Sequence, residues 1–452
     1  MLQKSTDLMS DKEEKPRWLQ NADTSDEELP RVLVSTPYPF NTETGGGITL
    51  RSLFQGWPKN RLAQVYGMGH SRDSNMCDNY FLLNESSARW TSPSPIWRMR
   101  RFAPFILGQN EVGAIWARLT SQLMKFVRDF QPEIIFTQLG TLLQIRLAMR
   151  LAEFAGVPLA VHVADDWANG FHQGKDPVNR YLHHRLEKEF REALEVTAVR
   201  WGMSLPMAQA YRERYGGEWG HIYNPIFVER WPERSAPKST NGKFRVLYSG
   251  SIIGGAQKRS LTDICDAVAG LGAEGMEIEM NIYTFAQYLG LRAELERPPY
   301  VRMHEQAPYE KLPEHLASAD LLVLPVNFDQ ESINYIRYSM PGKVSEYLLS
   351  GTPTLVYGPG EVVPVEYAQR EGWGEVITQQ GIEGVMKAIR DLAADPGRRA
   401  ALARRAREVG LKNHDAKVIR ARFRHEISQA VIQTKKYERG SRREECETRS
   451  FA

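Results

Sequence analysis

The chain has 452 residues, 42% of them hydrophobic and 25% charged, the composition of a globular protein too long for one ordinary core. With 58 basic and 55 acidic residues, the net charge of +3 gives no field that would attract nucleic acid to the whole surface. Three cysteines (Cys77, Cys265, Cys446) lie far apart, which argues against a disulfide framework or a zinc site. No stretch approaches the ~18 apolar residues of a membrane span, and the acidic N-terminus does not resemble a signal peptide, so we expect a cytoplasmic protein.

The chain opens with a charged segment. Residues 1–30 contain Asp-Lys-Glu-Glu-Lys and Asp-Glu-Glu runs and few apolar side chains, which predicts a disordered tail. Residues 31–35 then read as a buried strand, followed by a loop with three glycines at 45–47 and a helix. This order is typical of a Rossmann-like unit, in which glycines let the backbone approach a ligand. The loop is not Gly-x-Gly-x-x-Gly, which disfavours a dinucleotide site, and the glycines alone are equally compatible with a flexible turn.

Aromatic and basic residues alternate between Ile96 and Ile106, where Trp97 stands beside Arg98, Arg100 and Arg101. Such mixing suits an anionic membrane surface, with aromatic rings at the level of the headgroups and arginines on phosphates. The alternative is an ordinary helix and loop with core aromatics and solvated arginines. As a hypothesis, this segment docks the protein on the inner face of the membrane.

Strands and helices alternate after this segment, which predicts a parallel sheet covered by helices. The strand at 157–163 ends in a polar group: His162, then Asp165 and Asp166. Ligands bind at the carboxyl edge of such a sheet. A single histidine after a strand is more often structural, but a histidine with two aspartates at this edge raises the odds of a site.

A second unit follows a stretch rich in proline and serine at 227–243, which reads as a linker. Residues 244–249 form an apolar strand that meets Gly250, and a helix is expected from about residue 260. Lys258 and Arg259 lie just before that helix. We therefore expect an N-terminal domain at 31–226, a C-terminal domain at 244–412, a final helix at 413–434 that returns to the first domain, and a charged tail at 435–452.

The most informative stretch runs from Ser339 to Gly360 and reads as a short helix followed by a buried strand. Ser339 can cap the helix, with Pro341 in its first turn. Lys343 and Glu346 are three residues apart and share one face near the helix start. A cation, a carboxylate and unpaired helix N–H groups at one place suit a nucleotide diphosphate sugar. Alone, the pattern would be better explained as an amphipathic helix with a surface Lys–Glu pair.

The pattern Ser-x-Pro-x-Lys-x-x-Glu-Tyr-Leu-x-x-Gly-x-Pro resembles the donor-sugar signature of GT-B glycosyltransferases, particularly the retaining group called family 4. The resemblance covers nearly all of residues 31–434 and implies two Rossmann-like domains whose parallel sheets face an interdomain cleft. Many members carry a second glutamate eight positions before the first, where this chain has Tyr338, and Glu331 would need a different loop path to replace it. The departure leaves open which group contacts the donor sugar.

The resemblance also assigns roles to individual residues. It implies that Glu346 binds the donor ribose and that His162 with Asp165 or Asp166 lines the acceptor side of the cleft as the catalytic group. Donor-binding roles are implied for Gly46, Gly47, Gly250, Lys258, Arg259, Ser339 and Lys343.

We therefore expect a glycosyltransferase that moves a sugar from a nucleotide diphosphate sugar to an acceptor hydroxyl, with no cofactor and no metal ion. Retention at the anomeric carbon, a sugar or lipid-linked acceptor, and a role in cell-surface polysaccharide or glycolipid synthesis are implied by the resemblance alone. Two alternatives remain: a GT-B nucleotide-sugar epimerase, and a catalytically degenerate GT-B module that binds or assembles partners. No nucleic-acid partner is expected.

Overall fold

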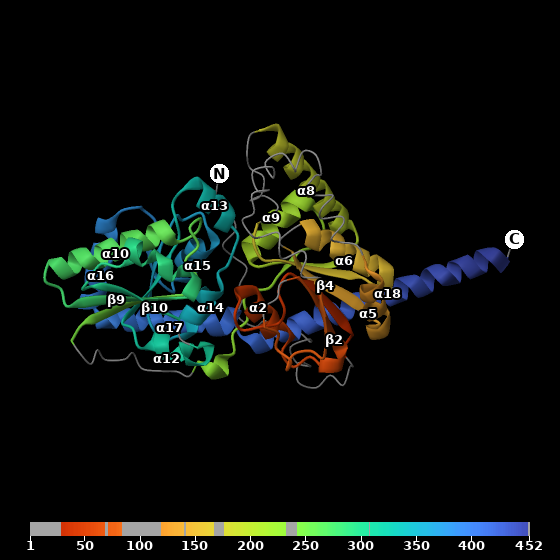
Figure 1. Ribbon diagram of the computed structural model, residues 1–452, viewed down its shortest axis with the longest axis horizontal. Helices are drawn as coiled ribbons and strands as arrows, with labels where there is room; N and C mark the ends of the chain where they lie inside the picture. Colours follow the sequence, from red (N-terminus) through yellow and green to blue (C-terminus); the bar gives the residue numbers. More distant parts are fainter. Residues whose placement is uncertain are drawn as a thin grey trace, which may run out of the picture.

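A computed structural model describes residues 29–67, 71–83, 119–139, 142–166, 176–231, 242–306 and 308–450. The described chain forms two halves, each built around one parallel sheet (Figure 1). The aromatic and basic segment at 96–106 and most of the N-terminal tail lie outside the described residues.

The first sheet has the order β3-β2-β1-β4-β5-β6-β7, and all its described strand pairs are parallel. Its strands are β1 (Val32–Thr36), β2 (Leu62–Tyr66), β3 (Asn79–Leu82), β4 (Ile134–Leu139), β5 (Leu159–Val163), β6 (Thr197–Gly202) and β7 (Gly220–His221). The helices of this half are α2 (Gly45–Phe54), α5 (Ser121–Phe130), α6 (Leu142–Ala155), α8 (Pro177–Glu195) and α9 (Leu205–Tyr215). The central strands β1, β2, β4 and β5 are buried throughout, as expected of a sheet covered on both faces.

The second sheet has the order β10-β9-β8-β11-β12-β13 and is likewise parallel. Its strands are β8 (Phe244–Ser249), β9 (Ile278–Thr284), β10 (Val301–Glu305), β11 (Leu321–Pro325), β12 (Thr354–Tyr357) and β13 (Glu375–Ile377). Helices α10 (Lys258–Ala273), α11 (Arg292–Leu295), α12 (Leu312–Ala317), α13 (Gln330–Ile336), α14 (Gly342–Leu349), α15 (Val363–Glu371), α16 (Ile382–Ala394) and α17 (Pro396–Asn413) belong to this half. The prediction of two Rossmann-like units with parallel sheets is confirmed.

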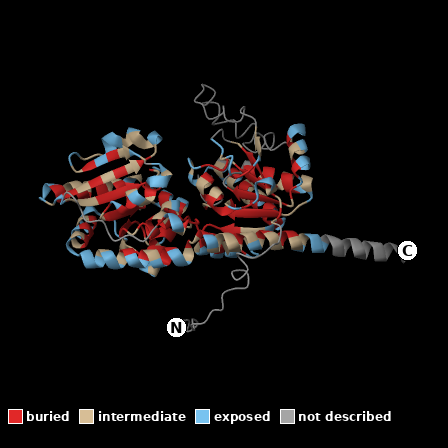
Figure 2. Ribbon diagram, turned by 90° about the horizontal axis from the view of Figure 1, so that it is seen from below, coloured by how far each residue is buried: buried red, intermediate tan, exposed pale blue. Residues whose placement is uncertain are grey.

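The chain crosses between the halves twice, and the two crossings pair with each other. Ile226 forms a parallel bridge with Asp415: its N–H donates to the carbonyl of His414 at 2.9 Å, and its own carbonyl accepts from Ala416 N–H at 2.9 Å. Helix α18 (Ala416–Ser450) then returns along the first half, so that α17 and α18 together lie along one side of both halves (Figure 2). The helix was expected to end at residue 434 but continues to Ser450. Charge density suggested a tail there, but Lys, Arg and Glu are good helix formers, and this segment contains no proline.

An aromatic cluster fastens α18 to the first half. Phe423 is fully buried, and its ring centre lies 5.1 Å from that of Phe54, 5.6 Å from Phe136 and 5.4 Å from Trp201. Edge-to-face contacts of this kind add to the free energy gained by burying apolar area. The final helix is therefore part of the core of the first half.

Replacing Phe423 with alanine should lower the free energy of unfolding by about 3–5 kcal/mol, because the ring leaves a cavity among three aromatic neighbours. Urea denaturation followed by tryptophan fluorescence measures the loss, since Trp201 belongs to the cluster. The control is Tyr437→Ala on the same helix, where the side chain is 79% exposed. Equal effects of the two substitutions would show that α18 does not contribute to this core.

Candidate functional site

The carboxyl ends of the two sheets meet at a short contact between the halves. The hydroxyl of Ser339, which precedes α14, donates to Asp165 Oδ1 after β5 at 2.7 Å. Ser204, at the end of β6, donates to the carbonyl of Tyr338 at 2.8 Å. Asn224 of the first half accepts from the Thr49 hydroxyl at 2.8 Å and links the halves by donating to the carbonyl of Met340 at 2.9 Å. The segment 338–340 is therefore held by the first half at three successive residues.

We expected Ser339 to cap α14, and this prediction was wrong. The helix begins at Gly342, Pro341 occupies the capping position, and no side chain caps it. The Ser339 hydroxyl is instead directed across the interface to Asp165. Sequence reasoning considered only the local partner of this serine, whereas the structure supplies a distant one.

Helix α14 places Lys343 against the end of β8. The Lys343 ammonium donates to the hydroxyl of Tyr248 at 2.6 Å and lies 4.1 Å from the centre of that ring. Gly250 follows β8 with a φ of +123°, and a Cβ there would come within 3.1 Å of the Lys343 Nζ. A glycine is thus required both by the backbone conformation and by the approach of the lysine. Tyr347 completes the contact, its hydroxyl accepting from Ser249 N–H at 3.0 Å.

Lys343 and Glu346 are partly buried, and among the described residues neither forms an ion pair. Burial lowers the pKa of Lys343 to about 7, although the nearby Glu346 carboxylate favours its charged form. Burial also raises the pKa of Glu346 to about 7, and Lys343 opposes that shift. Each group therefore influences the pKa of the other, while burial favours the uncharged form of both, a state that an added ligand can change.

Glu346 also faces the segment after β10. Burial raises the pKa of Tyr309, and the Glu346 carboxylate adds to this shift, while Arg230 and Arg51 counteract it. Tyr309 and Arg51 come from different halves of the molecule. Charged groups from both halves therefore influence this phenol.

The basic residues at the start of α10 already have acidic partners. Lys258 forms an ion pair with Glu294, and Arg259 lies 3.3 Å from Asp329. The first turn of this helix is held by Asn327, whose side-chain oxygen accepts from Ser260 N–H at 3.2 Å. The structure therefore places Lys258 and Arg259 at the start of the expected helix, where each forms an ion pair with a carboxylate.

The glycines at 45–47 are not in a loop, in contrast to the expectation. They form the first turn of α2, which Thr44 caps by accepting from Gly47 N–H at 3.1 Å. A Cβ on Gly46 would lie 1.9 Å from the ring of Tyr38, and one on Gly47 would lie 2.4 Å from the side chain of Asn41. Close packing of the preceding loop on this helix explains why these two positions are glycine.

The three polar residues at the end of β5 have different surroundings. His162 is fully buried; its Nδ1 lies 3.2 Å from the amide nitrogen of Gln138, and burial lowers its pKa to about 4. Asp166 is buried as well, accepting from the Tyr211 hydroxyl at 2.8 Å and pairing with Arg214 at 3.1 Å. Asp165 is the partly exposed member.

Asp165 is directed toward the space between the halves. Burial raises its pKa, the hydrogen bond from Ser339 opposes this, and its charge is the largest cause raising the pKa of Tyr335 to about 12. Tyr38 is also close, since Asp165 adds to the raised pKa of that phenol, and the Tyr38 hydroxyl donates to Gln138 beside His162. Among the described residues, His162 is linked to Tyr38 through Gln138.

Tyr248 and Tyr38 were not singled out from the sequence. Tyr248 lies in a strand whose apolar run suggested only a core position, and Tyr38 lies in a loop with no motif of its own. Tyr248 stands just before Gly250 at the end of its strand, whereas no nearby glycine marks Tyr38.

Among the described residues, no group of three or more His, Cys, Asp and Glu side chains could hold a metal ion. In the same part of the chain, no helix is both long and apolar enough to cross a membrane.

Solved structures with the same arrangement identify the fold. HepE of Anabaena, solved with UDP, is 12% identical, with a TM-score of 0.59 over 88% of this chain and 100% of that one. Sucrose-phosphate synthase of Thermosynechococcus elongatus is 15% identical, with a TM-score of 0.63 over 88% and 99%. For α,α-trehalose 6-phosphate synthase of Burkholderia multivorans the values are 13% and 0.61 over 90% and 100%. The chain has the GT-B fold. No protein-family model and no curated protein matches the sequence.

Asp165 and Tyr38 of the first half, with Gly250, Lys343 and Glu346 of the second, therefore form the candidate site. It joins an acidic group, a cation and the start of a helix, an arrangement that can bind a diphosphate and hydroxyl groups together.

The pKa of Glu346 makes stability depend on pH. In the folded protein the pKa is about 7, above the ordinary value of 4.5, so the native state retains the proton that the unfolded chain has lost. Wild type should therefore lose stability relative to Glu346→Gln as the pH rises from about 4.5 to about 7, with little further change above. Denaturation midpoints at a series of pH values measure the difference. Glu331→Gln changes an exposed carboxylate on α13, so its stability relative to wild type should not depend on pH. The explanation fails if the stability of Glu346→Gln relative to wild type is equally independent of pH.

Proposed function

We propose that this protein is a glycosyltransferase that uses a nucleotide diphosphate sugar as donor. The observation that carries the proposal is the pair Lys343 and Glu346, two partly buried charges without ion-pair partners among the described residues, next to Gly250 in a GT-B cleft. Buried charges that lack compensation in the free protein are typical of sites completed by a ligand. HepE, a protein of the same fold, was solved with UDP and with UDP-glucose, so UDP is the first donor nucleotide to test.

In this proposal the donor lies along the ends of β8 and α14. Lys343 and the N–H groups at the start of α14 bind the diphosphate, which Gly250 lets approach the backbone. Glu346 accepts hydrogen bonds from the ribose hydroxyls. Lys258 and Arg259 contribute only when the diphosphate displaces Glu294 and Asp329 from them.

The acceptor enters from the side of the first half, where Asp165 accepts a hydrogen bond from its hydroxyl. The acceptor oxygen forms the new bond to the anomeric carbon while the bond to the diphosphate breaks. The electron pair of that bond goes to the diphosphate, and the hydroxyl proton goes to a carboxylate or phosphate oxygen in the cleft. Lys343 stabilises the charge that develops on the leaving diphosphate, a role that preorganised cations fill in dry sites.

We propose retention at the anomeric carbon and independence from metal ions on the resemblance to family 4. The proposed synthesis of cell-surface polysaccharide or glycolipid rests on that resemblance as well. Attachment to an anionic membrane is a separate proposal that rests on residues 96–106.

Thermal-shift titration with UDP, GDP and ADP tests the donor site. At a hundred times its dissociation constant, a ligand that binds only the folded state adds about 2.7 kcal/mol to stability. We expect one nucleotide to raise the melting temperature of wild type and of the control Glu331→Ala, and to lose this effect in Glu346→Ala and Lys343→Met. If no nucleotide stabilises wild type, the degenerate binding module becomes the better reading. Isomerisation of the donor sugar without any acceptor would instead identify an epimerase.

The two adjacent aspartates should respond differently to substitution. Asp165→Asn should reduce sugar transfer by at least about 100-fold while nucleotide stabilisation persists, because this group faces the acceptor. Asp166→Asn should instead lower the melting temperature, since its buried carboxylate holds Tyr211 and Arg214 in the first half. Transfer rates and melting curves of both variants show which aspartate acts in transfer and which stabilises the fold. Full activity in Asp165→Asn would remove this residue from the mechanism.

A further inference from the structure

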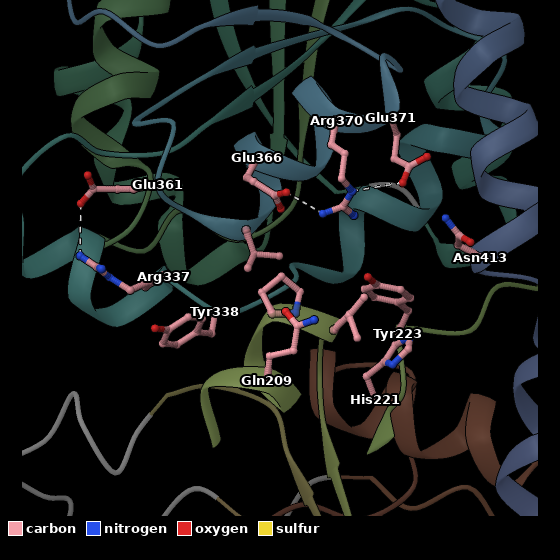
Figure 3. A pocket seen from close by; sticks show the side chains of 13 residues that line it. Gln209, His221, Tyr223, Arg337, Tyr338, Glu361, Glu366, Arg370, Glu371 and Asn413 are labelled. Atoms are coloured by element: carbon pink, nitrogen blue, oxygen red, sulfur yellow. Dashed lines mark hydrogen bonds and ion pairs between the residues drawn. The ribbon is translucent and has the colours of Figure 1, made fainter. Parts of the chain in front are cut away.

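A separate cavity of about 550 Å³ lies between the halves and is lined in part by Tyr338 (Figure 3). The first half contributes Gln209 on α9 and Tyr223 after β7, and the second half contributes Arg337, Tyr338 and the start and end of α15. None of the residues assigned to donor or acceptor lines it. Its volume is within the ~300–1,000 Å³ range of small-molecule sites.

The charges in this cavity already satisfy one another. Arg337 pairs with Glu361 at 3.2 Å, and Arg370 pairs with Glu366 at 2.6 Å and with Glu371 at 3.3 Å. Three carboxylates thus face two arginines, and burial lowers the pKa of the nearby His221 to about 4, so it adds no positive charge at neutral pH. A phosphate or carboxylate ligand would find no available cation and an excess of negative charge.

One polar group that faces the cavity has no protein partner in the described part of the chain. The side-chain amide of Gln209 forms no hydrogen bond with the described residues and points into the cavity (Figure 3). The second oxygen of Glu366 also lacks a partner among them, but it has almost no accessible surface. An amide both donates and accepts hydrogen bonds, so a ligand that carries hydroxyl groups can bind to Gln209. The ligand should therefore carry neutral hydrogen-bonding groups.

Apolar and aromatic side chains provide the rest of the wall, with Leu205, Pro206 and Val363 among them. Tyr223 and Tyr338 lie in the two halves and both line the space (Figure 3). Rings with polar tips suit a ligand that is apolar on one face and hydroxylated at its edge. A pyranose has this form, with C–H groups on its face and hydroxyls around it.

We propose that this cavity binds a neutral saccharide. Because its walls come from both halves, the saccharide binds best when the halves are arranged as in this structure. The backbone carbonyl of Tyr338 is held by Ser204, and the next residue holds Asp165, so an occupied cavity stabilises the interdomain contact at the proposed transfer site. The binding itself does not depend on the proposed function.

Saturation-transfer NMR on the full chain without nucleotide tests the proposal. The probes are glucose, galactose, mannose, N-acetylglucosamine, sucrose and trehalose, with glucose 6-phosphate and spermidine as charged comparisons. At least one neutral saccharide should bind, and Gln209→Trp, which fills the cavity from an exposed position on α9, should weaken it at least tenfold. The matched control is Glu213→Trp on the exposed surface of the same helix, which should leave affinity unchanged.

The proposal is overturned if no neutral saccharide binds, if binding is unchanged in Gln209→Trp, or if a charged probe is preferred and is lost in that variant. Melting curves verify that both tryptophan variants are folded. Incubating the bound saccharide with the donor then distinguishes an acceptor from an effector. An acceptor becomes glycosylated, whereas an effector changes donor hydrolysis without being modified. If the proposed transferase activity fails, the saccharide still binds, so the two failures are distinguishable.

Discussion

The pairing of the two crossing segments is the constraint on which the rest of the molecule depends. Ile226 and Asp415 lie side by side, so both connections between the halves pass through one place. His414 is buried there, with its Nδ1 3.3 Å from the carbonyl of Asn224 and its Nε2 3.3 Å from the hydroxyl of Tyr367. Burial lowers the pKa of this histidine to about 4, so it stays neutral and can satisfy both neighbours. Everything in the cleft is positioned relative to this crossing.

Away from the crossing, the described contacts between the halves include few polar ones. Segment 338–340 is held by the Ser339–Asp165 and Ser204–Tyr338 hydrogen bonds and by the hydrogen bond that Asn224 donates to the carbonyl of Met340. Individual hydrogen bonds contribute about 1 kcal/mol each, which allows a ligand to change the arrangement of the halves. Donor binding at α14 and occupation of the second cavity would both act on this short segment.

In the second half, the position of Lys343 is fixed by its neighbours, while Lys343 and Glu346 have no ion-pair partners among the described residues. Tyr347 and Tyr248 fix α14 against the end of β8, so Lys343 has little freedom of position. Its charge and that of Glu346 remain uncompensated among the described residues, and burial shifts both pKa values toward 7. Rigid placement reduces the entropy that a ligand must overcome, while the uncompensated charges supply the free energy of binding.

The sequence by itself determined the class of fold and the position of the donor motif. Apolar runs of strand length, separated by helical segments, are local patterns, and the spacing of Lys343 and Glu346 follows from helix geometry alone. The tertiary structure decided which residues face the cleft. Asp165, Asp166 and His162 are neighbours in sequence, yet burial and distant partners give each a different environment. The role of Ser339, the acidic partners of Lys258 and Arg259, and the second cavity likewise depend on residues far away in the chain. No local pattern encodes such contacts, because they arise only when two separately folded sheets come together.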